Sequence, residues 1–86
     1  MRKMTELREQ LLAICERIAS ASVEPRDGAG QIWLLLAEAD YPPEVEDFRV
    51  FVGAVSEMAD HPEHEARYAE DIREEARLKL EQQRSG

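Results

Sequence analysis

The chain has 86 residues, of which 43% are apolar, and its 19 acidic and 11 basic side chains give a formal net charge of −8. This length allows one small domain whose core is too small for a deeply buried active site. The acidic balance disfavours direct binding to nucleic acid, because contacts to phosphate need lysine and arginine.

Two further features bear on location. The longest uncharged apolar run, 29–37, is about half of the roughly 20 residues that a membrane span needs. The charged amphipathic start of the chain is unlike a secretory signal, and the single Cys15 cannot form an intramolecular disulfide. We therefore expect a cytoplasmic protein with no membrane contact.

The first predicted element is a helix over 5–21. Leu7, Leu11, Ile14 and Ile18 recur at intervals of four, three and four residues, which places them on one face. Thr5 is a suitable N-cap for this helix. The segment 22–25 ends it, because the residue before a proline is pushed out of the helical region.

A second helix is predicted over 25–39, with Pro25 at its first position. The run 32–36 is apolar almost without interruption, which is typical of a central helix, and Trp33 within it is expected to lie in the core. Gly28 and Gly30 weaken the first turn of this helix, but they allow another helix to approach closely.

The third and fourth helices are predicted over 43–59 and 62–82, with a frayed tail at 84–86. Apolar residues at helical spacing mark both, and Asp60 with Glu63 forms a capping-box pattern at the start of the fourth. Short connections make consecutive helices antiparallel. The sequence therefore predicts an all-α protein: a single-domain antiparallel four-helix bundle covering residues 1–86.

Candidate chemistry along the chain is weak. His61 and His64 lie three residues apart, but zinc needs three or four ligands, and Cys15 is far away in the sequence. Cys15 has apolar neighbours, which favours a small core residue over a nucleophile. The many carboxylates fall on helix ends and outer faces, where they are hydrated and unsuited to acid–base catalysis. We therefore expect no enzymatic activity, no cofactor and no metal.

The charge distribution is more informative. Between residues 38 and 75, thirteen acidic side chains face only three basic ones. A folded bundle would gather much of this charge around the third helix, the 60–65 turn and the fourth helix. Such a surface attracts a basic partner over long range, in a salt-dependent way. It also fits an ordinary soluble surface, since net charges of this size are common in small domains.

One segment resembles a known family. The hexapeptide 57–62, Glu-Met-Ala-Asp-His-Pro, is similar to the part of the colicin-E-type DNase immunity proteins in which an acidic helix ends in a Glu-Met-x-x-His-Pro turn. The likeness extends over 48–63. The layout of helices around proline turns also resembles the colicin-D-type immunity proteins, which block a tRNA-cleaving toxin. Both groups are small, acidic, all-helical bacteriocin immunity proteins.

This resemblance implies roles for particular residues. In the DNase group, an acidic second helix supplies selectivity, and a pair of tyrosines after the His-Pro turn supplies shared binding energy. The matching positions are the acids from Glu44 to Glu57 and the single Tyr68. This chain differs in having Tyr68 inside a predicted long helix, where the DNase group has adjacent tyrosines followed by proline on a very short helix.

Charge and resemblance together lead to one hypothesis: an immunity-type protein that binds and inhibits a basic nuclease toxin. The expected contacts are acidic residues that pair with the toxin's lysines and arginines and two tyrosines that anchor the interface. These residues are Glu44, Glu46, Asp47, Glu57, Asp60, Glu63, Glu65, Tyr68 and Tyr41. The alternative is a helical interaction or regulatory module that forms a homodimer or docks on a larger assembly through an apolar stripe.

Overall fold

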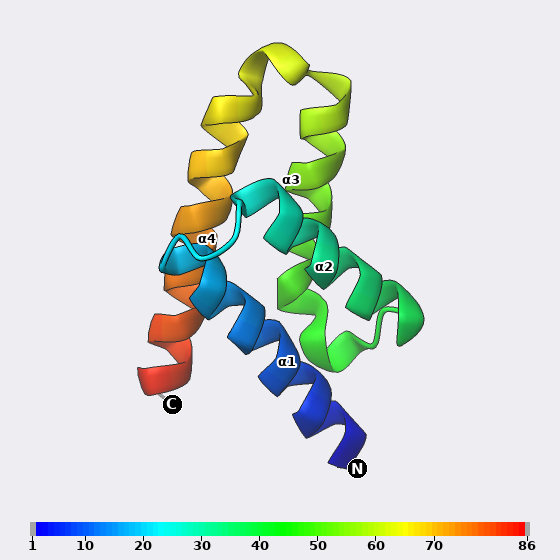
Figure 1. Ribbon diagram of the computed structural model, residues 1–86. Helices are drawn as coiled ribbons and strands as arrows, with labels where there is room; N and C mark the ends of the chain where they lie inside the picture. The colour runs from blue at the N-terminus through cyan, green and yellow to red at the C-terminus, as the bar shows by residue number, and fades with distance from the viewer. Residues whose placement is uncertain (1, 86) are drawn as a thin grey trace.

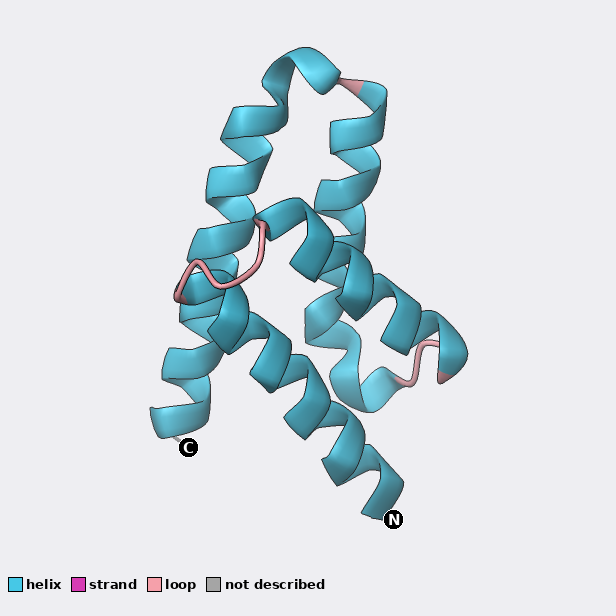
Figure 2. Ribbon diagram, viewed as in Figure 1, coloured by secondary structure: helices cyan, strands magenta, loops and turns pink. Residues whose placement is uncertain are grey.

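Helices make up nearly all of the computed structural model, which describes the backbone of residues 2–85 and the side chains of residues 6–83. Figures 1 and 2 show helices joined by short turns. In chain order the elements are α1 (Arg2–Ala19), α2 (Pro25–Glu38), η1 (Pro43–Phe48), α3 (Arg49–Asp60), η2 (Pro62–His64) and α4 (Glu65–Ser85).

Helices α1 and α2 form one antiparallel pair, and α3 and α4 form a second (Figure 1). The two pairs pack on each other. α1 lies against α4, α2 lies against α3, and α1 and α2 contact one another. The α3–α4 hairpin continues past the start of α2, so its turn stands clear of the first pair (Figure 1). The molecule measures 42 × 26 × 18 Å. The prediction of an all-α four-helix bundle is therefore confirmed.

The core contains the apolar stripes that the sequence pattern predicts. Leu11 and Ile18 of α1 and Ile32 and Leu36 of α2 belong to one core cluster, and all four side chains are fully buried. Burial of such a side chain contributes roughly 1.5–3 kcal/mol. The remaining fully buried large side chains and the buried cysteine are Val45, Phe48, Phe51, Ile72 and Cys15.

One of the two glycines of α2 allows close helix packing. A Cβ atom at Gly28 would lie 2.5 Å from Cγ1 of Ile18. A larger residue at this position would therefore prevent α1 and α2 from lying as close together as they do. A Cβ atom at Gly30 would meet nothing within 4 Å. The predicted close approach therefore holds for Gly28 and is wrong for Gly30.

The first two helices end earlier than predicted, at Ala19 and Glu38. Ala21 and Asp40 adopt left-handed backbone angles, with φ of 65° and 63°. The next amides then close the helices: Ser22 N–H donates to the Arg17 carbonyl at 2.9 Å, and Tyr41 N–H donates to the Leu36 carbonyl at 2.8 Å. This is the Schellman arrangement, built here without glycine. At its other end, α1 begins at Arg2, so the backbone of Thr5 is helical and is not the N-cap.

The single α-helix predicted over 43–59 is two elements. Residues 43–48 form 3₁₀ turns, and Val45 has non-helical angles of φ −120° and ψ 29°. Val45, at the kink, and Phe48, at the end of the segment, are both buried. The Pro42-Pro43 start therefore gives a tight turn that places two core residues.

The capping box predicted at the start of the fourth helix is also wrong. Asp60 is the last residue of α3, and His61 is the residue that breaks the helix, with φ −132° and ψ 70° and no side-chain cap hydrogen bond. An extended residue before Pro62 follows from proline sterics. α4 continues through Arg84 to Ser85, so their backbone is helical rather than frayed, whereas Gly86 lies outside the described residues.

Helix α2 is less buried than its composition suggests. Trp33 lies half-buried at the margin of the core, and Leu34 is 64% exposed. A helix with neighbours on one side buries only part of its circumference, so a continuous apolar run leaves some residues facing water. The prediction that Trp33 is a core residue is therefore wrong.

Candidate partner-binding site

The residues proposed for partner binding lie at opposite ends of α3. Glu44, Glu46 and Asp47 belong to η1, before the first residue of α3, whereas Glu57 and Asp60 lie at its last turn. A helix of twelve residues is about 18 Å long at 1.5 Å per residue. The structure thus divides the predicted acidic surface in two.

We call residues 57–68, at the α3–α4 turn, the tip. The nine consecutive residues 59–67 are all exposed. This follows from the packing, because the tip extends beyond the ends of the helices that cover the rest of the hairpin (Figure 1). Four of the proposed acids lie here, and their side chains face water: Glu57, Asp60, Glu63 and Glu65.

Polar contacts within the tip are local and solvent-exposed. Nδ1 of His61 lies 3.6 Å from Oε2 of Glu63, and Nε2 of His64 lies 3.9 Å from the same oxygen. The one cation that reaches the tip from another helix is Arg26, 3.7 Å from Glu65, among the described side chains of residues 6–83. Exposed pairs of this kind contribute about 0–1 kcal/mol and leave the carboxylates accessible.

Tyr68 is the half-buried residue of the tip. Its hydroxyl donates a hydrogen bond to Oε1 of Glu57 at 3.4 Å, and the ring of His64 meets it edge-on at 6.5 Å between centroids. Desolvation, followed by the negative charge of Glu57, raises the pKa of Tyr68 above its usual value. The phenol therefore stays protonated at neutral pH. Its ring is oriented by Glu57 of α3 and His64 of η2.

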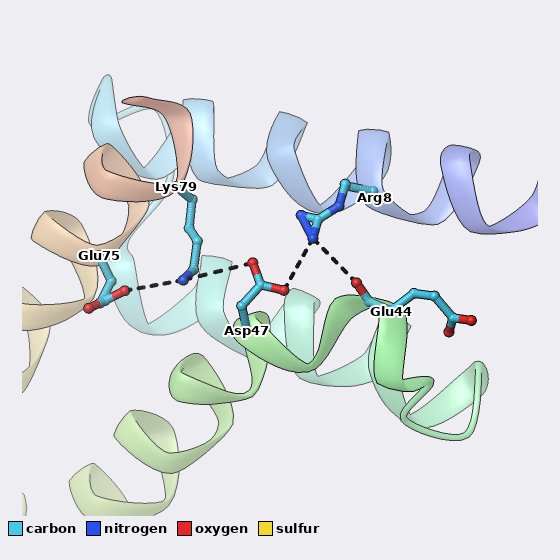
Figure 3. A network of polar contacts seen from close by, with 5 residues as sticks. All are labelled: Arg8, Glu44, Asp47, Glu75 and Lys79. Carbon is cyan, nitrogen blue, oxygen red and sulfur yellow. Dashed lines mark hydrogen bonds and ion pairs between the residues drawn. The ribbon is translucent and has the colours of Figure 1, made fainter. Parts of the chain in front are cut away.

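At the opposite end of α3, Asp47 has cations on both sides (Figure 3). Arg8 Nη2 donates to Oδ1 of Asp47 at 3.2 Å and to the carbonyl oxygen of Glu44 at 3.3 Å. Lys79 Nζ lies 4.0 Å from Oδ2 of Asp47 and 3.7 Å from Oε1 of Glu75. Asp47 therefore joins α1, η1 and α4, and its charge is compensated within the molecule.

The ring of Phe48 supports both cations of this network. The Arg8 guanidinium carbon lies 5.2 Å from the ring centroid and the Lys79 nitrogen lies 5.8 Å from it. Only 9% of Lys79 is exposed, and its aliphatic stem packs with the core. A hollow of about 220 Å³ opens beside the network, lined by Arg8, Asp47, Phe48, Lys79, Gln82 and Gln83.

Tyr41 also lies away from the tip. Its hydroxyl accepts a hydrogen bond from Trp33 Nε1 at 2.9 Å, and the Arg49 guanidinium stacks over its ring at 5.2 Å. Arg49 is the first residue of α3, so the two proposed tyrosines are at opposite ends of that helix. The hydroxyl and one ring face of Tyr41 therefore already have partners within the molecule, at the connection between α2 and η1.

In the described range 2–85, no three histidine, cysteine, aspartate or glutamate residues are grouped as a metal would require. Burial raises the pKa of the Cys15 thiol to about 12, although Lys79 opposes the shift. The thiol is therefore protonated and covered at neutral pH.

Sequence reasoning missed Arg8, Lys79 and a second hollow on the α3–α4 hairpin. Lys79 follows Ile72 and Ala76 at helical spacing, so the pattern places it on the buried stripe of α4. A charged residue on a buried stripe indicates an ion-pair partner on a neighbouring element, so Lys79 could have been identified from the sequence. Nothing in the local sequence marks Arg8, because its partner is 39 residues away. The second hollow depends on Val50 and Leu78, from two different helices.

Comparisons with known proteins do not assign this chain to a family. Neither the protein-family models, nor the curated proteins, nor the solved structures give a match. Of the helices in residues 2–85, none combines the length and the apolar character that crossing a bilayer requires.

Proposed function

We propose that this protein is a non-enzymatic immunity-type inhibitor that binds a basic nuclease toxin through its tip. The observation that carries the proposal is the exposure of residues 59–67 in a segment rich in acids. That segment overlaps the hexapeptide 57–62, whose resemblance to the colicin-type immunity proteins was noted from the sequence.

The tip has the electrostatic character that such an inhibitor needs. Glu57, Asp60, Glu63 and Glu65 project from one turn, and Arg26 is the single cation from another helix that pairs with them within the described side chains. A nuclease must present lysine and arginine to hold phosphate. Exposed carboxylates therefore steer the two proteins together and occupy the cations that nucleic acid would contact.

Tyr68 supplies the anchoring element of the proposed interface. Aromatic residues in partly desolvated positions dominate binding energies, and acids around them form the rim. The hydrogen bond to Glu57 and the edge contact with His64 hold the ring before any partner arrives. A preoriented side chain loses less conformational entropy on binding.

Our proposal keeps only some of the nine predicted residues at the interface. Glu44 and Glu46 are exposed but lie about one helix length from the tip, and Asp47 and Tyr41 have intramolecular partners. In this proposal the tip residues make the primary contact. Glu44 and Glu46 would contribute only to long-range attraction.

The test is co-purification with the product of the neighbouring reading frame, followed by inhibition of its nuclease activity. Asp60→Lys with Glu63→Lys should slow association about tenfold and flatten its salt dependence. Glu44→Lys with Glu46→Lys is the matched control, with the same charge change at the other end of α3. Equal effects of both double variants would remove the tip from the interface, and absence of any complex would refute the inhibitor.

A helical interaction module remains the second candidate, and exposed apolar residues favour it. Leu34 on α2 is 64% exposed. An interface built on it would give a homodimer or a docked assembly that persists at high salt, because apolar burial is not screened. Sedimentation at low and high salt separates this candidate from the electrostatic one.

A further inference from the structure

A second hollow lies on the outer side of the α3–α4 hairpin, along the seam between the two helices. It has a volume of about 310 Å³ and is lined by Val50 of α3 and by Asp71, Glu74, Glu75 and Leu78 of α4. We call it the outer groove. Leu78 is 10 residues along α4 from Tyr68, the last residue of the tip, which corresponds to about 15 Å.

Two apolar side chains meet in the outer groove. Val50 is 44% exposed and Leu78 is 42% exposed. Among the described side chains of residues 6–83, these are two of the three large apolar residues that face water, and they come from different helices. Isolated apolar residues on a surface are ordinary, but two that converge on one hollow form a seat for an apolar side chain of a partner.

Carboxylates surround this apolar seat on the α4 side. Asp71 and Glu74 form no ion pair with any side chain described between residues 6 and 83, while Glu75 lies 3.7 Å from Lys79. Arg73, the nearest cation along α4, points to Glu70 at 3.5 Å. The outer groove therefore combines two apolar side chains with two carboxylates, Asp71 and Glu74, that have no ion-pair partner among the side chains of residues 6–83.

We propose that the outer groove binds a basic amphipathic helix of a partner protein. One apolar residue of that helix would sit between Val50 and Leu78, and lysines or arginines beside it would contact Asp71 and Glu74. Helices recognised in grooves present such anchors at one face. A second copy of this chain is disfavoured, because a symmetric contact would bring the acidic rims of both copies together. The inference goes beyond the proposed function, since it uses a different surface and needs no nuclease.

The experiment titrates the full-length protein with a synthetic helical peptide that has a leucine stripe flanked by lysines. Methyl resonances of Val50 and Leu78 are followed by NMR, with Leu34 as the internal reference for non-specific contact. Selective shifts at Val50 and Leu78 are expected. A peptide of the same composition without helical spacing should bind about tenfold more weakly, because it lacks a single apolar face.

Two variants of the outer groove separate its apolar and charged contributions. Val50→Ser with Leu78→Ser and Asp71→Asn with Glu74→Gln should each weaken peptide binding about tenfold, which corresponds to one decade in Kd. Glu44→Gln with Glu46→Gln is the charge-matched control and should leave it unchanged. All of these positions are exposed, so we expect the variants to fold. Thermal melts followed by circular dichroism check this.

Three results would overturn the inference: no selective shifts, equal weakening by the control variant, or a dimer in sedimentation that the outer-groove variants abolish. The tip variant Asp60→Lys with Glu63→Lys should retain peptide binding. Failure of the proposed inhibitor and failure of the outer groove are therefore recorded by different measurements.

Discussion

At one end of α3, Asp47 is held between Arg8 and Lys79 beside the ring of Phe48; Phe48 and Lys79 are buried, while the side chains of Asp47 and Arg8 stay 40% and 38% exposed. At the other end, the acids of the tip are exposed and have mainly local partners. The carboxylates are chemically alike in both places. The comparison shows that distant helices packed against a carboxylate decide whether its charge serves the fold or remains available to a partner.

The largest difference in stability between the two ends of α3 is expected when the Phe48 ring is removed from beneath Arg8 and Lys79. Phe48→Ala should lower the free energy of unfolding by about 3–5 kcal/mol, because it empties a fully buried site and removes the ring beneath two cations. His64→Ala at the tip should change it by about 0.5 kcal/mol or less. Urea denaturation of both variants measures the contrast, and similar losses would contradict it.

The cysteine beside the network gives a pH test. Burial raises the pKa of Cys15 from 9.0 to about 12, so above pH 9.0 the unfolded thiol loses its proton while the folded thiol keeps it. Stability should therefore fall as pH rises from 9 to 12, by about 1.4 kcal/mol per pH unit from this group. Cys15→Ala should show a flatter profile in the same denaturation series. Identical slopes would mean that the thiol is not protected.

A milder change separates two neighbouring acids of η1. Asp47→Asn should cost about 1 kcal/mol, because it weakens the partly exposed contact with Arg8 and leaves the buried Lys79 with Glu75 alone. Glu46→Gln, one residue earlier and without an ion pair to any side chain of residues 6–83, should change stability by about 0.5 kcal/mol or less. Chemical denaturation at low and high salt would reveal the difference, and equal values would show that the network contributes nothing.

The smallest effect is expected at the tip itself. Asp60→Asn with Glu63→Gln should shift the free energy of unfolding by no more than about 0.5 kcal/mol, with any gain at low salt, because it relieves repulsion between exposed charges. Thermal melts at two salt concentrations check this. A loss as large as that of Asp47→Asn would place the tip acids within the stabilising structure.

Most of the fold could be predicted from periodicity. The stripe through Leu7, Leu11, Ile14 and Ile18 is buried as expected, since helical spacing and apolarity determine which face of α1 turns inward. The breaks at prolines were also predictable. The 3₁₀ turn at Val45 was not, because the choice between two helical windings depends on what the next helices leave room for.

The candidate site was less predictable. Spacing of four residues along a helix favours ion pairs of Glu75 with Lys79 and of Glu63 with Arg67. The structure has the first pair, whereas Glu63 lies near His61 and His64 instead. The capture of Asp47 by Arg8 spans 39 residues, so no local pattern contains it. The sequence determines which charged residues the chain has, but tertiary packing determines which of them form ion pairs.

The long exposed run at the α3–α4 turn separates two properties of this chain. Since the bundle draws no core residue from positions 59–67, that stretch can be exchanged, lengthened or re-charged while the remaining residues fold as before. Under the proposed function, grafting a different nine-residue sequence onto the same bundle would change the partner that is bound without changing the fold. Recognition and folding would then depend on different residues of the same chain.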